Sequence, residues 1–466
     1  MFSLKTFQRL NHFKLMPAPT AAIYLAVFLV FGSNVKGQSP APDQHETVSW
    51  MARPAFYEVF VRDFSPKGNF AGVLDGLDRI QATDANVIWL MPIYPVGQIN
   101  KKGSIGSPYA VADYRGINPE FGSASDLHRL IDTAHGRGMK VILDFVANHT
   151  AWDHVWMRKH ADRYTHDANG RITVPLDNNG KLTDWTDAAD LNYDNPDTRR
   201  AMIADMRYWL ETFNVDGFRM DVAEFVPDDF WRQAIAQLRS VKPILMLAEA
   251  GDPKMHADGF DLTYGWSAYG ELKDVWKKSR SGADWVARQV TDVEKLPNHG
   301  RRLYFTTNHD ETGNDQPPVT LFGGSAGARA AFVAVTLLPG VPLIYNGEEV
   351  ESPQKLTLFD KIPIAWGQPN AASTSAFYDK VIHLERTHPA FSGRDLTAVT
   401  TTAPNDVIAY RRGNVVVLVN TRPQPANVSV TGMTLRGARD LLSGKLQETD
   451  QVALPSYGAA VLEPAR

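Results

Sequence analysis

The chain has 466 residues, enough for one large domain with one or two smaller ones. Its composition, 44% hydrophobic and 21% charged, is typical of a globular protein, and a net charge of −4 argues against nucleic acid as a partner. Cysteine is absent, which excludes disulfides and thiolate metal sites.

Residues 1–45 have the order of a secretory signal peptide and leader. Lys5, Arg9 and Lys14 precede an apolar run at 21–31, and small residues such as Gly32 and Ser33 follow it. A membrane anchor is the alternative, but this run is shorter than the roughly 20 residues that a membrane span needs. The segment therefore predicts a secreted or periplasmic protein without membrane contact after cleavage.

From residue 55 onward, short apolar strand-like runs alternate with amphipathic helical ones. The expected helices include 124–136, 198–213, 227–240 and 326–338. The expected strands are 57–61, 87–91, 140–144, 217–220, 244–248, 260–263, 303–307 and 343–345. Eight strands alternating with helices predict an α/β fold, a (β/α)8 TIM barrel.

Two segments interrupt this alternation. Residues 151–190 are polar and have little periodicity, which predicts an inserted lobe (domain B) that divides the barrel into residues 46–150 and 191–391. After residue 391 the helices stop, and short alternating runs at 407–410, 415–419, 428–430 and 459–462 follow. They predict a C-terminal all-β sandwich domain at 392–466.

Polar residues cluster where four of the expected barrel strands end. The third strand ends in Asp144, the fourth in Asp221, the fifth in Glu249 and the seventh in Asp310. A single acid at a strand end often only caps the next helix. Several acids at neighbouring strand ends of a barrel instead predict an active site, because that face carries the catalytic groups.

The segments 144–149, 217–221 and 308–310, together with Glu249, resemble the α-amylase family, glycoside hydrolase family 13. Further similar segments are 72–77, 87–92, 190–192 and 340–348. The resemblance implies a retaining hydrolase of α-1,4-glucosidic bonds in starch-like glucans or maltooligosaccharides. It implies that Asp221 is the nucleophile, Glu249 the general acid/base and Asp310 the supporting carboxylate.

The same resemblance implies that Tyr109, His149, Arg219 and His309 bind substrate. The Tyr109 ring would stack on the sugar at the cleavage point, unless it is an ordinary core tyrosine. His149 and His309 would bind sugar hydroxyls as neutral imidazoles. Arg219 would keep Asp221 ionised, and its alternative role is that of a structural partner of Asp144.

Structural calcium is a further expectation that comes from the resemblance. In many members of the family, an asparagine at the place of Asn148 and an aspartate at the place of Asp190 bind calcium between the barrel and the lobe. Oxygen ligands of this kind suit calcium.

Some residues depart from the family pattern. Glu224 and Phe225 stand where typical α-amylases have Lys-His, and no acid of the kind that closes the pocket of α-glucosidases precedes Tyr109. The second departure favours an open cleft. A neopullulanase or cyclomaltodextrinase-like enzyme and a maltooligosaccharide transglycosylase remain alternatives, as do a non-catalytic glycan-binding protein and a metallohydrolase. No sequence feature predicts an oligomeric state.

Overall fold

The computed structural model describes residues 49–297 and 299–465. The predicted signal peptide and leader, residues 1–45, lie outside the described residues, so secretion stays a prediction. In the described part of the chain, no helix has the length and apolar character that crossing a membrane requires.

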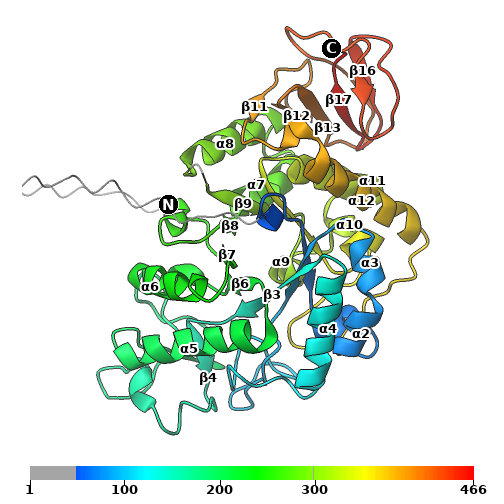
Figure 1. Cartoon of the computed structure of the whole chain (residues 1–466). Coiled ribbons are helices and arrows are strands. Elements are labelled where there is room, and N and C mark those ends of the chain that lie inside the picture. The colour runs from blue at the N-terminus through cyan, green and yellow to red at the C-terminus, as the bar shows by residue number, and fades with distance from the viewer. Residues whose placement is uncertain (1–48, 298, 466) are drawn as a thin grey trace, which may run out of the picture. The chain divides into compact units, whose positions relative to one another are not determined.

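The central element is a closed barrel of eight parallel strands, which confirms the predicted TIM barrel (Figure 1). Each of the eight expected strands is present, and β1 closes the barrel by pairing with β10. In barrel order the strands are Phe56–Val59 (β1), Val87–Leu90 (β2), Lys140–Phe145 (β3), Gly217–Met220 (β6), Leu245–Ala248 (β7), Leu262–Tyr264 (β8), Arg301–Tyr304 (β9) and Gly340–Tyr345 (β10).

The barrel strands are mostly apolar because both of their faces are buried. In β7, Leu245 and Leu247 belong to an apolar cluster that fills the barrel, whereas Met246 and Ala248 pack in the layer beneath the helices. Alternate residues of one strand therefore pack into two different apolar cores.

Helices surround the barrel and join its strands. The long helix α4 begins with a capping box, in which Ser123 and Asp126 bind each other's backbone N–H groups. The helices are Val61–Phe64 (α1), Phe70–Asp75 (α2), Leu77–Gln81 (α3), Ala124–Gly136 (α4), Pro196–Phe213 (α5), Asp228–Arg239 (α6), Trp266–Trp276 (α7), Gly282–Lys295 (α8), His309–Asn314 (α9), Pro318–Leu321 (α10), Ser325–Thr336 (α11) and Ala371–Thr387 (α12).

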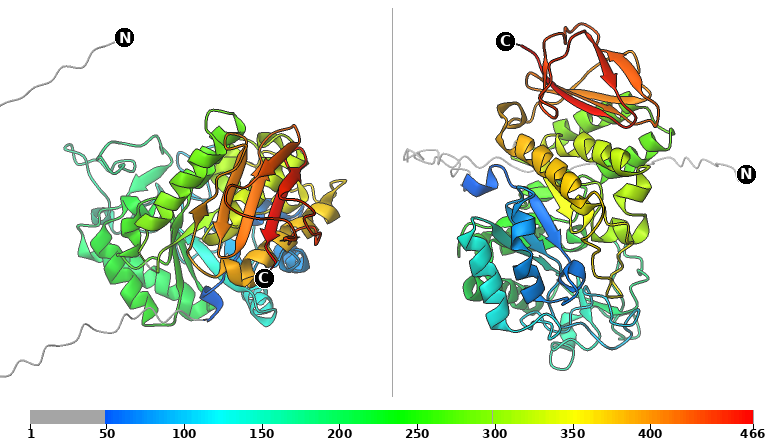
Figure 2. Two further views of the ribbon diagram at one scale, coloured as in Figure 1. Left: turned by 90° about the horizontal axis from the view of Figure 1, so that it is seen from above. Right: turned by 90° about the vertical axis from the view of Figure 1, so that its right-hand side faces the viewer.

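The lobe between β3 and α5 contains one antiparallel pair, His149–Ala151 (β4) with Ala188–Asp190 (β5), and is otherwise made of turns. The C-terminal part is all-β, as predicted, and Figure 2 shows it beyond the helices of the barrel. Its two sheets share one apolar core and thus form a sandwich. Its strands are Thr397–Ala398 (β11), Val407–Arg412 (β12), Val415–Asn420 (β13), Ala426–Ser429 (β14), Arg439–Asp440 (β15), Gln451–Leu454 (β16) and Ala459–Glu463 (β17).

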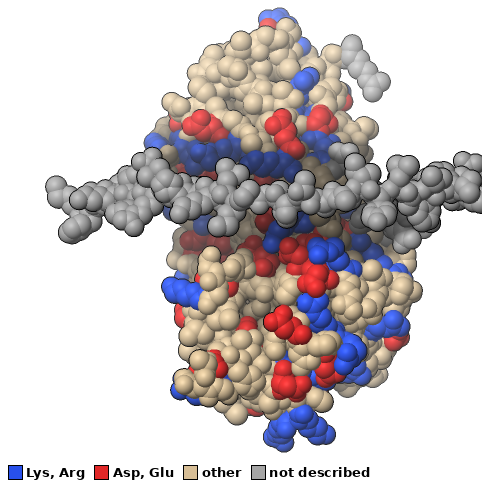
Figure 3. Space-filling model, turned by 90° about the vertical axis from the view of Figure 1, so that its left-hand side faces the viewer, with Lys and Arg blue, Asp and Glu red and all other residues tan. Residues whose placement is uncertain are grey.

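Charged side chains of both signs lie on the face of the molecule shown in Figure 3. Lys and Arg gather in a band next to the C-terminal domain, and acidic and basic side chains are interspersed over the barrel below it. The visible part of this face therefore carries both signs of charge, in agreement with 48 Lys and Arg and 52 Asp and Glu residues in the chain.

Gly217 at the start of β6 provides a test of the strand packing. A Cβ atom there would lie 2.0 Å from the carbonyl oxygen of Leu245 on β7, and the φ angle of Gly217 is +152°. We expect Gly217→Ala to lower the free energy of unfolding by about 3 kcal/mol, because backbone cannot yield as a flexible side chain does. Urea unfolding measures this change in the free energy of unfolding.

Gly270→Ala is the matched control. No atom lies within 4 Å of the added Cβ in α7, so this variant should gain up to about 1 kcal/mol from helix propensity. Equal effects of the two substitutions would contradict the packing argument.

Candidate active site

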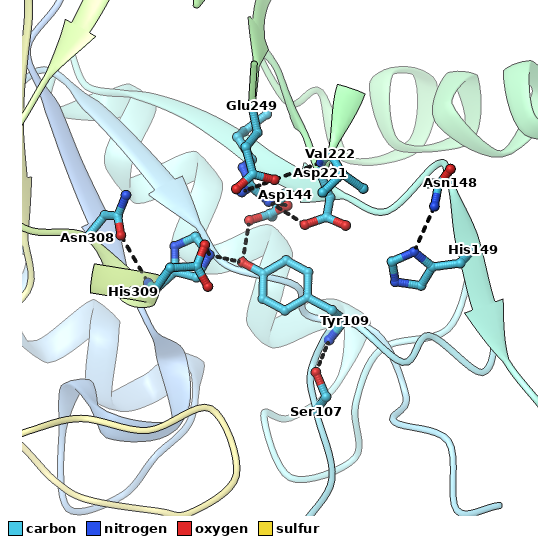
Figure 4. Close-up of polar contacts among 12 residues, drawn as sticks. Ser107, Tyr109, Asp144, Asn148, His149, Asp221, Val222, Glu249, Asn308 and His309 are labelled. Carbon is cyan, nitrogen blue, oxygen red and sulfur yellow. Dashed lines mark hydrogen bonds and ion pairs between the residues drawn. The ribbon is translucent and has the colours of Figure 1, made fainter. Parts of the chain in front are cut away.

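The polar residues predicted at the strand ends meet at one face of the barrel (Figure 4). Asp144 comes from β3, Asp221 follows β6, Glu249 follows β7, and His309 and Asp310 begin α9 after β9. A cavity of about 370 Å³ opens above them. The predicted site residues that line it are Tyr109, His149, Asp221, Glu249 and Asp310.

Arg219 on β6 holds the carboxylates of this site together. Its guanidinium is fully buried, and Nη1 donates hydrogen bonds to Asp144 at 2.9 Å and to Asp221 at 3.0 Å. Nη2 lies 2.9 Å from Oε2 of Glu249. Burial alone would lower the pKa of Arg219, but Asp144 and Glu249 raise it well above its usual range. The guanidinium therefore stays charged.

Asp221 and Glu249 are largely buried carboxyl groups that follow the neighbouring strands β6 and β7. Burial raises the pKa of both; the positive charge of Arg219 opposes this rise, and nearby carboxylates add to it. The charge of Arg219 and the charges of the carboxylates therefore act on both groups in opposite directions.

Val222 connects these two carboxyl groups through the backbone. It has φ +37° and ψ +49°, a left-handed conformation that is rare for a β-branched residue. Such a conformation costs about 1–3 kcal/mol, which the surrounding packing must offset. In it, the Val222 N–H donates a 2.7 Å hydrogen bond to Oε2 of Glu249. The strained turn thus positions the side chain of Glu249.

Tyr109 reaches the same group of residues from the loop after β2. Its hydroxyl donates to Oδ2 of Asp144 at 3.0 Å and lies 2.7 Å from Nε2 of His309. Because the single hydroxyl proton points at Asp144, Nε2 of His309 acts as the donor to Tyr109. The ring of Tyr109 faces the cavity, as expected for a stacking surface.

Glu58 on β1 is a site residue that the sequence analysis missed. It is fully buried, and one of its oxygens lies 2.5 Å from Nδ1 of His309 while the other has no hydrogen-bond partner. An acid inside the apolar run Phe56–Val59 was the available sequence signal.

Charged neighbours raise the pKa of His309, in contrast to the neutral imidazole that was predicted. Nδ1 lies 2.5 Å from Glu58 and Nε2 lies 2.7 Å from Tyr109, and a charged imidazolium can donate to both. Burial lowers the pKa of His309, but Asp310 and Glu58 overcome this effect and raise it to about 9. Burial lowers the pKa of His149 to about 4, a direction that favours the neutral imidazole.

Arg219 and His309 lie beneath the cavity and do not line it. Their observed partners are carboxylates and Tyr109, so substrate binding by these two residues stays a prediction. Asp310, in contrast, lines the cavity with one third of its side chain exposed. Arg219 also pairs with Asp144, which was the alternative role predicted for it, and it contacts Asp221 at the same time.

The lobe supplies aromatic surface that was also missed. Trp185 lines the cavity, and its ring is stacked on Phe225 at 5.9 Å and tilted against His149 at 5.4 Å. Phe225, which departs from the histidine of the family pattern, therefore makes an aromatic contact with the lobe. A tryptophan in an otherwise polar segment was the only signal for this surface.

The two candidate calcium ligands are neighbours in the fold. The Asn148 carbonyl oxygen accepts the Leu191 N–H, and Asp190 pairs with His149 across β4 and β5. Burial raises the pKa of Asp190 to about 6. Over residues 49–297 and 299–465, no three His, Cys, Asp or Glu side chains are grouped as a metal site. Calcium prefers six to eight oxygens, so its binding here stays a prediction.

Two adjacent carboxyl groups below an aromatic-lined cavity provide the groups that acid-assisted cleavage of an acetal needs. Comparisons with known proteins agree with this chemistry. The family model "Alpha amylase, catalytic domain" matches residues 33–173 and 181–246. Alpha-amylase 3 of Dictyoglomus thermophilum is 30% identical over 344 residues, which are 65% of this chain and 64% of that protein. The chain thus spans just under two thirds of that relative.

Solved structures match over a larger part of the chain. An α-amylase from Lactobacillus plantarum has a TM-score of 0.76 at 30% identity and covers 88% of this chain and 98% of its own. A maltogenic α-amylase, AmyB, from Thermotoga neapolitana has a TM-score of 0.76 at 29% identity, with 88% and 96% covered. The chain belongs to the α-amylase family. It is an enzyme of that family, whose members hydrolyse or transfer glycosidic bonds.

Replacement of Glu58 tests the charge of His309. Because the pKa of His309 in the fold lies above that of free imidazole, its ion pair stabilises the fold fully below about pH 6.5. This contribution, roughly 3 kcal/mol, is lost as the pH rises through about 9. Glu58→Gln should flatten the fall in unfolding free energy over this range, as urea unfolding at several pH values measures.

The matched control is Glu211→Gln, since Glu211 is a half-exposed acid that pairs with Arg207. It should leave the pH dependence unchanged. An unchanged slope in Glu58→Gln as well would contradict an ion pair between Glu58 and His309.

Proposed function

We propose that the protein is a retaining glycoside hydrolase that cleaves α-1,4-glucosidic bonds of starch-like glucans or maltooligosaccharides. The observation that carries this proposal is the contact of one guanidinium, Arg219, with both Asp221 and Glu249 at the floor of the cavity. Retaining enzymes need two carboxyl groups about 5–5.5 Å apart, and one arginine that contacts both keeps them close. The α-amylase names of relatives support the choice of substrate.

In the first step, the Asp221 carboxylate attacks the anomeric carbon and a glycosyl ester forms. Glu249 gives its proton to the departing glycosidic oxygen, so that the leaving sugar departs as a neutral alcohol. Arg219 donates a hydrogen bond to Asp221, and this favours the ionised form that attacks. Its Nη2 lies 2.9 Å from Glu249 but not in hydrogen-bond geometry, so Glu249 receives no such bond from this guanidinium.

In the second step, the Glu249 carboxylate takes a proton from water and the resulting hydroxide attacks the anomeric carbon. The ester bond to Asp221 breaks, and the sugar leaves with its original α configuration. If a sugar hydroxyl replaces water, the same step makes a new glycosidic bond. Hydrolase and transglycosylase therefore share these residues.

Two further residues complete the proposed roles. Asp310 reaches the cavity with a partly exposed carboxylate and can accept hydrogen bonds from sugar hydroxyls. The Tyr109 ring offers an aromatic surface to the apolar C–H face of a glucosyl unit. The hydrogen bond of its hydroxyl to Asp144 fixes the orientation of that ring.

Asp221→Asn should lower kcat on maltooligosaccharides by at least about 10³-fold, because the ester can no longer form. Glu249→Gln should lower kcat on natural substrates by about 10²–10⁴-fold. It should lower the first step far less on aryl glycosides whose leaving group needs no proton. Steady-state and burst kinetics on both substrate types measure the difference.

Asp229→Asn is the control, since Asp229 is an exposed acid of α6 that pairs with Arg199. Its activity should equal that of the unmodified enzyme. Ordinary activity of Asp221→Asn on starch, with its fold confirmed by circular dichroism, would refute the assignment.

A further inference from the structure

The connection between β2 and α4, residues 91–123, contacts the loops on both sides of it. Toward the lobe, Nζ of Lys102 lies 3.4 Å from the Asp187 carboxylate and donates to the Asp184 carbonyl oxygen at 3.1 Å. Asp187 is only 5% exposed. The positive charge of Lys102 compensates this buried carboxylate, which makes the contact more than a surface ion pair.

The same connection also contacts the loop between β10 and α12. Ser104 Oγ donates to the Asp360 carboxylate at 3.2 Å and lies 3.4 Å from the Phe359 carbonyl oxygen. Gly103, with φ +65°, passes so close that a Cβ atom on it would lie 2.5 Å from Cβ of Phe359. Only glycine fits this approach. Three loops are thus joined into one structure, the glycone wall, which consists of Lys102, Gly103, Ser104, Asp187 and Phe359.

The glycone wall borders the catalytic cavity. Lys102, Asp187 and Phe359 line the same cavity as Asp221 and Glu249. The loops that form it follow β10, β2 and β3. Around the barrel these strands come in the order β10, β1, β2, β3, so only β1 stands between them. Glu249 follows β7. This strand lies opposite β1, because three strands separate the two in either direction around the barrel. The wall and the proposed acid therefore face each other across the cavity.

This arrangement gives the bound glucan a direction. Glu249 protonates the leaving oxygen, so the leaving part of the glucan lies on the β7 side. The retained glycosyl unit points toward the wall, and in an α-1,4-glucan it is the unit nearer the non-reducing end. Any sugars attached beyond it must fit between Asp221 and the wall.

We infer that the glycone wall ends the binding cleft a short distance from the cleavage point, so that the enzyme removes short units from the non-reducing ends of α-glucans. This inference rests on the proposed function and deepens it. A closed end gives chain-end cleavage because an internal segment of a long chain cannot pass through the wall. The specificity then depends on contacts between loops as well as on the catalytic carboxyl groups.

The experiment follows the cleavage of maltoheptaose that carries a fluorescent tag at its reducing end. With the unmodified enzyme, the first products should be short untagged sugars and long tagged fragments. On amylose, iodine staining should fall slowly relative to the release of reducing ends. Random early cleavage by the unmodified enzyme would overturn the inference. No cleavage of any α-glucan by the folded enzyme would instead refute the proposed function.

Variants then test the wall itself. Phe359→Ala and Lys102→Ala should raise the share of internal cuts and the ratio of amylose to maltotriose activity by about tenfold, while Lys101→Ala should leave both unchanged. Lys101 is the matched control because it is exposed on the same loop and its ammonium donates a hydrogen bond to the side chain of Gln98. An unchanged cleavage pattern in both folded wall variants would also overturn the inference.

Discussion

The buried guanidinium of Arg219 is the interaction on which the rest of the site depends. It sits between Asp144, Asp221 and Glu249 with no exposure to solvent. Burying several charges is unfavourable unless they compensate one another, and removing one partner leaves the others without compensation. The barrel supplies this compensation because β3, β6 and β7 are neighbours and bring their carboxyl ends to the same place.

Around this charge, the structure separates the tasks of two similar carboxyl groups. Asp221 receives a direct hydrogen bond from Arg219, whereas Glu249 receives the Val222 N–H from a strained turn. A second chain of contacts runs from Glu58 through His309 to Tyr109 and Asp144. This chain orients the tyrosine ring in the cavity and adds a positive charge below Asp310.

Much of this architecture could be predicted from the sequence. The eight strands are short apolar runs, and Asp221, Glu249 and Asp310 stand at their ends, where the fold places active sites. Glu58 could not be found in the same way, because its position within β1 hides the contact with His309, 251 residues further along the chain. That contact and the neighbouring Asp310 together raise the pKa of His309, so the sequence alone could not show the full shift.

The loop contacts were equally hidden. Lys102 pairs with Asp187, and Gly103 lies against Phe359. These contacts join loops whose sequences show no pattern that relates one loop to another. The sequence analysis favoured an open cleft because one familiar acid is missing before Tyr109. The structure shows that other residues border the cavity on that side. A missing motif residue therefore does not define the shape of a cleft that several loops build together.

The most direct test of the account is to trap the glycosyl-enzyme. The enzyme is incubated with a fluorinated α-glucosyl fluoride, whose good leaving group permits the first step and whose ring fluorine slows the second. Mass spectrometry of the digested protein then locates the bound sugar. The account predicts a single adduct on the peptide that contains Asp221, at its carboxylate. An adduct at any other residue, or turnover with inversion of configuration and no adduct, would contradict it.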